Sequence, residues 1–136
     1  MDRDKIVEEK FVDDFIIRSM RTRIKYELSK KEKHWFVIRK LCPDTLDAFI
    51  QKYIVFKDRK VQYADVLKIM SRYVDVKSNV YYMHMDGGNY MAFTDAMSAC
   101  MEELFPSVVI CNDNVAFFKS DTEGVAGMRC ILVKNQ

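Results

Sequence analysis

The chain has 136 residues, 49% of them apolar and 12% aromatic, and a formal net charge of +2. This length suits one domain with a single core, and four Gly and two Pro are too few for a long disordered linker. Uninterrupted apolar runs reach only four residues, whereas a membrane-spanning helix needs about 20, and the N-terminus lacks the apolar stretch of a secretory signal. We therefore expect one domain over residues 1–136, located in the cytoplasm and outside any membrane.

The first segment, residues 5–28, has the periodicity of an amphipathic helix. Acidic residues gather near its start and basic residues near its end, the order that complements a helix dipole. The pattern predicts one long helix that turns a broad apolar stripe toward the core. The stripe consists of apolar residues at every fourth position: Val12, Ile16, Met20, Ile24 and Leu28.

Residues 29–75 predict further helices. The run Ser29-Lys30-Lys31-Glu32 fits a capping box, which marks the start of a helix. Residues 53–56 fit either the end of a helix or a strand, because periodicity does not distinguish short apolar runs. Helices are expected from Ser29 to Pro43, from Asp44 onward, and over 62–73.

After Asp75 the sequence favours strands. Asp86-Gly87-Gly88-Asn89 and Asn112-Asp113-Asn114 are turn signals, each between two segments rich in β-formers. Thr94 suits the N-cap of a helix over 95–105, which is expected to bury Leu104 among its apolar residues. Strands are expected at 80–85, 90–93, 108–111, 115–119 and 128–133.

Helices precede strands in this order, which is typical of the α+β class. We expect a helical half, residues 1–75, with three to four helices. It packs with a sheet-rich half, residues 76–136, which holds a mainly antiparallel sheet of four to five strands and one helix. Together the two halves form a single fold, since each alone is too small for a robust core.

Charge is spread unevenly along the chain. Residues 1–75 carry 18 Lys and Arg against 13 Asp and Glu, a net of +5, and residues 76–136 carry 4 against 7, a net of −3. A surface with concentrated positive charge can bind nucleic-acid phosphates or an acidic protein. The candidate binding residues in this basic segment are Arg18, Arg21, Lys25, Lys31 and Arg39.

A second candidate surface surrounds the Gly-Gly turn. Met adapts to irregular contacts and Tyr is enriched at interfaces. If one side of the two-stranded ribbon stays uncovered, its apolar side chains mark an interface; the alternative is that they fill an ordinary core. The residues concerned are Met83, Met85, Tyr90 and Met91.

Catalytic and metal-binding patterns are weak. Cysteines 42, 100, 111 and 130 form no C-x-x-C pair and suit buried apolar positions. A Cys–His site would have to join His84 to Cys111 or Cys130, and the sequence does not show that they meet. Asp113, Asp121 and Glu123 fit turns facing water better than a metal site. No cofactor and no metal are expected.

We therefore expect a small, non-enzymatic, protein-binding or regulatory module. The two sets of candidate binding residues do not identify its partner. The partner is expected to be another protein, which includes a second copy of this chain in a homodimer. The alternative is a nucleic-acid-binding protein that uses the basic helices of residues 18–40. A third reading, with the least support, is an enzyme with a Cys/His or carboxylate site.

Overall fold

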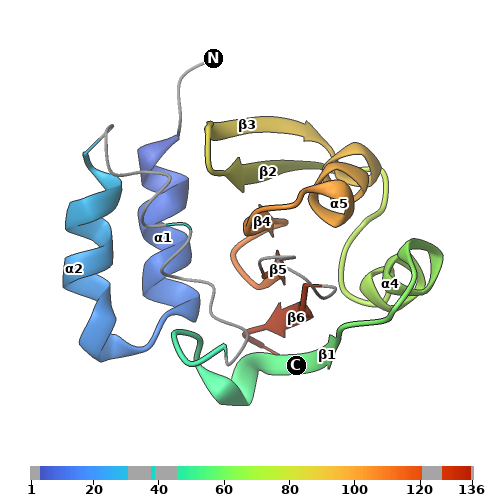
Figure 1. Cartoon of the computed structure of the whole chain (residues 1–136), viewed down its shortest axis with the longest axis horizontal. Coiled ribbons are helices and arrows are strands. Elements are labelled where there is room, and N and C mark those ends of the chain that lie inside the picture. Colours follow the sequence, from blue (N-terminus) through green and yellow to red (C-terminus); the bar gives the residue numbers. More distant parts are fainter. Residues whose placement is uncertain (1–3, 31–37, 39–45, 121–126, 136) are drawn as a thin grey trace.

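The protein forms three layers, with a sheet between two pairs of helices (Figure 1). The computed structural model describes residues 4–30, 38, 46–120 and 127–135. One face of the sheet packs against α1 (Lys5–Phe15) and α2 (Arg18–Leu28). The other face packs against α4 (Tyr63–Met70) and α5 (Phe93–Glu102). No helix in the described part of the chain is long and apolar enough to cross a membrane.

The single helix predicted for residues 5–28 is wrong, because the chain is extended at Ile16 and Ile17, between α1 and α2. Ile16 forms an isolated antiparallel bridge with Phe49, and the Ile17 amide donates to the Ala48 carbonyl at 2.8 Å. Ile16 is also fully buried. A contact with a distant segment therefore replaces a helical turn, while the four-residue apolar spacing continues through the break.

The second predicted helix lies almost wholly outside the described residues, and the third is wrong from Leu46 on. Leu46 has a positive φ of 59°, and a short 3-10 turn, η2 (Gln51–Tyr53), leads into strand β1 (Ile54–Asp58). The strand alternative for residues 53–56 is therefore correct over 54–56. The fourth predicted helix is confirmed in its centre by α4.

The remaining strands are β2 (Asn79–His84), β3 (Gly87–Ala92), β4 (Ser107–Ile110), β5 (Val115–Lys119) and β6 (Arg129–Val133). They form one sheet in the order β1-β6-β5-β4-β2-β3, in which every neighbouring pair is antiparallel. The α+β prediction is confirmed. The sheet has six strands instead of four to five because β1 joins it from the N-terminal half.

The turn between β2 and β3 and the start of α5 both differ from expectation by a few residues. Met85 and Asp86 form the turn, and the two glycines already belong to β3. The N-cap of α5 is Ala92 and not Thr94, because β3 runs into the helix without a loop and Phe93 is buried as its first residue. Leu104 is 66% exposed, so the expectation that it is buried is wrong.

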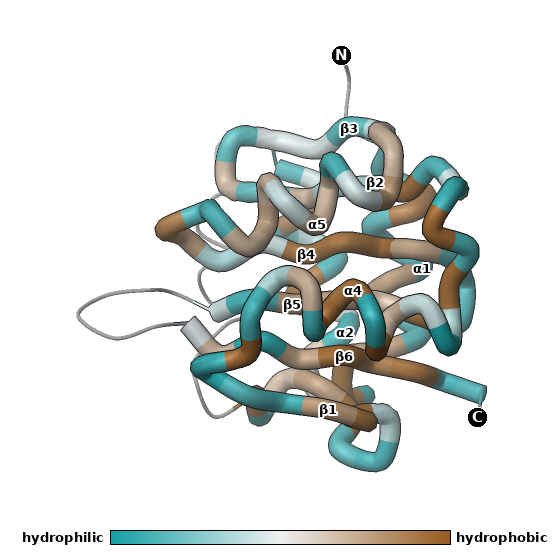
Figure 2. The backbone as a smooth tube through the Cα atoms, turned by 90° about the vertical axis from the view of Figure 1, so that its right-hand side faces the viewer, coloured by the Kyte–Doolittle hydropathy of each residue, from teal (hydrophilic) through white to brown (hydrophobic). Residues whose placement is uncertain are grey.

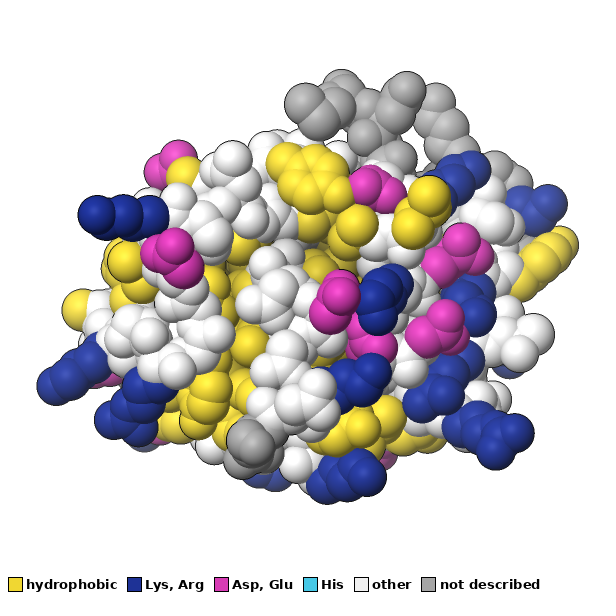
Figure 3. Space-filling view, turned by 180° about the vertical axis from the view of Figure 1, so that it is seen from behind, with side chains coloured by type: hydrophobic (Ala, Val, Ile, Leu, Met, Phe, Trp, Pro, Cys, Tyr) yellow, Lys and Arg dark blue, Asp and Glu magenta, His cyan; other side chains and the backbone are white. Residues whose placement is uncertain are grey.

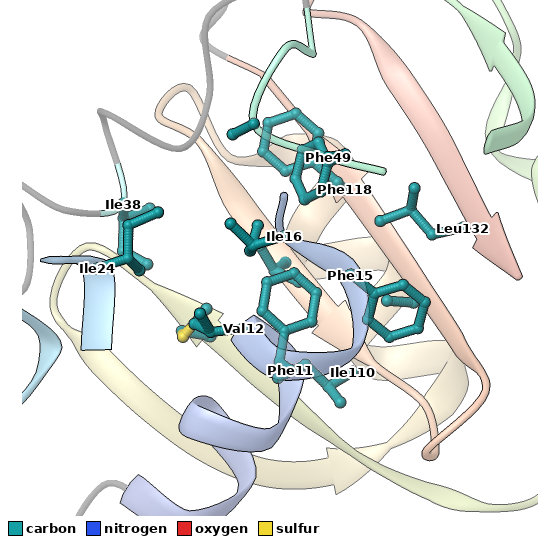
Figure 4. Close-up of a cluster of buried hydrophobic side chains, with 14 of the residues drawn as sticks. Phe11, Val12, Phe15, Ile16, Ile24, Ile38, Phe49, Ile110, Phe118 and Leu132 are labelled. Carbon is teal, nitrogen blue, oxygen red and sulfur yellow. The ribbon is translucent and has the colours of Figure 1, made fainter. Parts of the chain in front are cut away.

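The pleat of the sheet divides the apolar residues into two cores. Phe118 and Leu132 contribute to the core beneath α1 and α2, where Phe11 and Phe15 also lie (Figure 4). Phe117 points to the opposite core beneath α4 and α5. The central strands are buried on both faces and are therefore almost wholly apolar, whereas β3 at one edge is paler in hydropathy (Figure 2).

Candidate functional site

Several basic residues of α1 and α2 are engaged in contacts within the protein. Arg21 donates from Nε to the Ile16 carbonyl at 2.8 Å, which satisfies a backbone group at the break between α1 and α2. Lys25 pairs with Asp13 across the two helices at 2.8 Å. Arg18 is exposed. Lys31 and Arg39 lie outside the described residues.

Carboxylates are interspersed with the remaining cations on these helices. Arg23 pairs with Glu27 at 3.0 Å, and the buried Asp14 accepts from both Lys10 and Lys134. Figure 3 shows Lys and Arg side chains mixed with Asp and Glu on the side of the molecule where α1 and α2 lie. The positive charge counted in the sequence is therefore partly neutralised in the fold.

The pleat also separates the four candidates of the β2–β3 ribbon. Met83 is fully buried beneath α1 and α2, and Met85 packs partly against the same core. Met91 packs against the opposite core. Only Tyr90, at 47% exposure, presents a large area to solvent. For Met83 the alternative of an ordinary core position is therefore correct. Tyr90 is the one residue of these four that is largely exposed.

Tyr90 is held in place by a polar network that joins the ribbon to α1. Its hydroxyl donates to the Asp4 carboxylate, and its ring meets the Tyr81 ring edge-on at 5.1 Å between centroids. The Tyr81 hydroxyl donates to buried Glu8 at 2.6 Å and accepts from the Asp4 amide at 3.0 Å. Four residues from two distant segments thus fix the position of the β3 strand.

The hydrogen bond between Tyr90 and Asp4 also shifts both acid–base equilibria. The donated hydroxyl stabilises the carboxylate, so the pKa of Asp4 falls below its ordinary value, with the Val7 amide as the next contributor. The same bond stabilises the protonated phenol and raises the pKa of Tyr90 to about 12. Over the physiological range the pair therefore remains a phenol donating to a carboxylate.

Gly88 is required for this arrangement. A Cβ at this position would lie 2.0 Å from the Tyr81 hydroxyl oxygen, far inside van der Waals contact. Gly88 pairs with Met83 in the strand register, so the missing side chain makes room for the Tyr81 ring on the same face. Both glycines were expected in a turn, and no sequence pattern indicated this role for Gly88.

On the outer side of β3, backbone N–H groups have no partner among the described residues. The Phe93 amide donates to the Ser78 carbonyl at 2.9 Å. Because N–H groups alternate in direction along a strand, Met91, Asn89 and Gly87 also direct theirs toward β2. Gly88, Tyr90 and Ala92 then turn their N–H groups away from β2. Tyr90 and Ala92 are exposed, whereas Gly88 is buried. β2 is the only neighbour of β3 in the sheet, and no described residue bonds to these amides. This row of amides and carbonyls is the candidate functional site, which we call the β3 edge.

His84 lies apart from both Cys111 and Cys130, the two cysteines proposed to join it. Ile110 pairs with Tyr81, so Cys111 lies at the opposite end of β2 from His84, and Cys130 lies on the other face of the sheet. Burial raises the pKa of Cys100, Cys111 and Cys130 to about 12. A nucleophilic thiol needs the opposite shift.

Within the described segments, no three His, Cys, Asp or Glu side chains are grouped closely enough to hold a metal ion. Asp121 and Glu123 lie outside those segments. His84 instead stacks on Tyr82, with ring centroids 4.9 Å apart, and its Nδ1 accepts from the Asp86 amide at 3.3 Å. Its contacts are those of a residue that supports the ribbon turn.

The comparisons with known proteins return nothing from which to transfer a function. A scan against protein-family models finds no match, and searches of the curated proteins and of the solved structures find no significant similarity. The function is therefore inferred from the geometry of the β3 edge.

Proposed function

We propose that the protein is a non-enzymatic binding module that accepts an extended segment of a partner protein as an additional strand along the β3 edge. The observation that carries this proposal is the outward backbone N–H groups of the exposed residues Tyr90 and Ala92, which have no partner among the described residues, on a strand with no charged residue. Strand addition takes its affinity from such main-chain hydrogen bonds and its specificity from alternate side chains.

The absence of protection along β3 supports this role. Proteins usually shield edge strands with charged side chains, Pro, or bulges, since an open edge pairs with other chains. The sequence of β3, Gly-Gly-Asn-Tyr-Met-Ala, has no charge and no Pro, and its register with β2 is unbroken. An open edge of this kind invites aggregation unless a partner strand uses it.

Rigidity of the edge is the second support. Tyr90 is fixed by Asp4 and Tyr81, and the ribbon is paired along its full length with β2. A preorganised surface loses less conformational entropy on binding, so more of the hydrogen-bond free energy appears as affinity. Within this proposal, protein binding is favoured over nucleic-acid binding because Arg21 and Lys25 already serve contacts inside the protein.

A cytoplasmic location belongs to the same proposal. Cys100, Cys111 and Cys130 are free thiols. Free thiols are the usual state of cysteine in a reducing compartment.

The test is an NMR titration with a capped peptide of alternating valine and threonine flanked by lysines. We expect the amide resonances of Gly88, Tyr90 and Ala92 to shift. A peptide that is N-methylated on the amides facing the protein should leave them in place, because it lacks the donors. Shifts confined to β1, or equal binding of the methylated peptide, would overturn the proposal.

Ala92→Pro provides a variant that closes the edge without disturbing the fold. Ala92 has a φ of −60°, which suits Pro, and its N–H points away from β2. We expect the peptide to bind about tenfold more weakly, from one lost hydrogen bond and the steric bulk of the ring. Gln62→Pro is the matched control, at the exposed N-cap of α4 with a φ of −83°, and should bind normally.

A further inference from the structure

We infer that the strand recognised by the β3 edge carries Lys or Arg on both sides of its apolar core and comes from a different protein, not from a second copy of this chain. This inference rests on the proposed function and adds the chemistry of the partner. It follows from the charges that surround the edge and from the symmetry that self-pairing would impose.

Carboxylates flank the uncharged strand at both ends and on one face. Asp86 is exposed in the turn before β3, and Asp95 is exposed in the first turn of α5 directly after it. Asp4 lies beside Tyr90, which donates to it. Among the described residues, the neighbouring cations are Lys5, next to Asp4, and Lys77, which the β2–β3 register places opposite Thr94 and so near Asp95.

Self-pairing would bring these carboxylates together. An antiparallel pair of β3 strands related by a two-fold axis, with Tyr90 opposite its own copy, is the register in which all three outward positions of β3 pair with one another. In that register Gly88 lies opposite Ala92 of the second copy, and Asp86 lies opposite Thr94, next to Asp95. Both Asp4 side chains also flank the axis. Like charges opposed across strands are destabilising, so the edge selects against its own copy.

A strand with Lys or Arg at both ends would instead form favourable ion pairs with these carboxylates. Its terminal cations meet Asp86 at one end and Asp95 at the other, in either strand direction. Its core residue on the α1 side lies against Tyr90, where aromatic and β-branched residues pair well across strands. The residue on the opposite face lies against Met91, which is partly exposed and apolar.

The experiment compares two capped peptides with the same alternating valine–threonine core, one flanked by lysines and one by glutamates. We expect the lysine peptide to bind about tenfold more tightly at low ionic strength, as solvent-exposed ion pairs are weak individually. The preference should shrink to about twofold or less in about 1 M salt, where the screening length falls to about 3 Å. The double variant Asp86→Asn with Asp95→Asn should reduce the preference in the same way.

The outcomes separate this inference from the proposed function. Equal binding of both peptides, still weakened by Ala92→Pro, overturns the charge preference and leaves strand addition in place. Failure of both peptides to shift Gly88, Tyr90 and Ala92 overturns the proposed function as well. Light scattering is the final arm: we expect a monomer at low salt, and a dimer that Ala92→Pro abolishes would show that the second copy is the occupant.

Discussion

The two edges of the sheet are built differently. β1 carries exposed Lys57 and Asp58, and its register with β6 is interrupted between Ile54 and Phe56. β3 carries no charge, and its register with β2 is continuous. Charge and irregularity are common protections of edge strands, so β1 resembles a closed boundary of the fold and β3 an accessible one.

The difference shows that exposure of the backbone, and not exposure of apolar side chains, distinguishes the candidate site. Three of the four ribbon candidates, Met83, Met85 and Met91, pack wholly or partly into the cores. In β3 itself, Tyr90 and Ala92 are exposed and Gly88 is buried. The variants below remove contacts that hold this main chain in position, and they follow in decreasing order of expected effect.

Gly88→Ala should abolish the ordered β3 edge. The new methyl group would fall 2.0 Å from the Tyr81 hydroxyl oxygen, so the ring must move and the bonds to Glu8 and Asp4 must break. We expect a loss of about 2–4 kcal/mol in the free energy of unfolding, measured by urea denaturation. Asn89→Ala, one position further along the strand, serves as the control. If Gly88→Ala is no more destabilising than Asn89→Ala, Tyr81 does not need the space.

Tyr81→Phe and Tyr82→Phe form a matched pair on neighbouring positions of β2. The Tyr81 hydroxyl bonds Glu8 and the Asp4 amide, whereas no described residue makes a hydrogen bond of good geometry to the buried Tyr82 hydroxyl. Removing the first hydroxyl should cost about 1–3 kcal/mol more in unfolding free energy than removing the second. Equal costs for the two variants would show that the network with α1 does not stabilise the ribbon.

Tyr90→Phe should have the smallest effect, visible mainly in the pH dependence of stability. Since the folded pKa of Asp4 is lowered, its contribution is present above the unfolded pKa and is lost as pH falls through the folded value. The pKa of Tyr90 is raised to about 12, so its contribution is present below about 10 and is lost as pH rises toward 12.

The Tyr90→Phe variant should therefore flatten the stability profile at both extremes. We expect it to cost under about 1 kcal/mol at neutral pH, because solvent screens a pair this exposed. Thermal unfolding of the variant and of the wild type across the pH range measures the difference. An unchanged acid limb would contradict the role of the phenol in holding Asp4 ionised.

Local patterns predicted most of the strands and both hairpins, because turn residues and alternation of β-formers act over a few positions. They failed at Ile16, where pairing with Phe49 decides the backbone. No local pattern contains that contact, because the two residues are far apart in the chain. The sequence also could not place β1, because its partner β6 lies at the other end of the chain.

The candidate site was predictable in part. Tyr90 was identified from composition around the Gly-Gly turn, and its partner Tyr81 could have been found by counting equal distances from the turn at Met85 and Asp86. The edge position of β3 could not be predicted from the sequence, since it depends on the strand order of the whole sheet. The basic residues Arg21 and Lys25 were correctly placed on a helix, but their partners Ile16 and Asp13 became evident only with the break between α1 and α2.

The direct passage from β3 into α5 has a mechanical consequence. Ala92 is both the last residue of the strand and the N-cap of the helix, so no loop residue lies between the two elements. Immobilising Ala92 from outside would slow amide hydrogen exchange in the opening turn of α5, in the layer opposite Tyr90. Binding of a partner strand to β3 would in this way reduce the flexibility of α5 on the opposite face of the sheet, without any rearrangement of the fold.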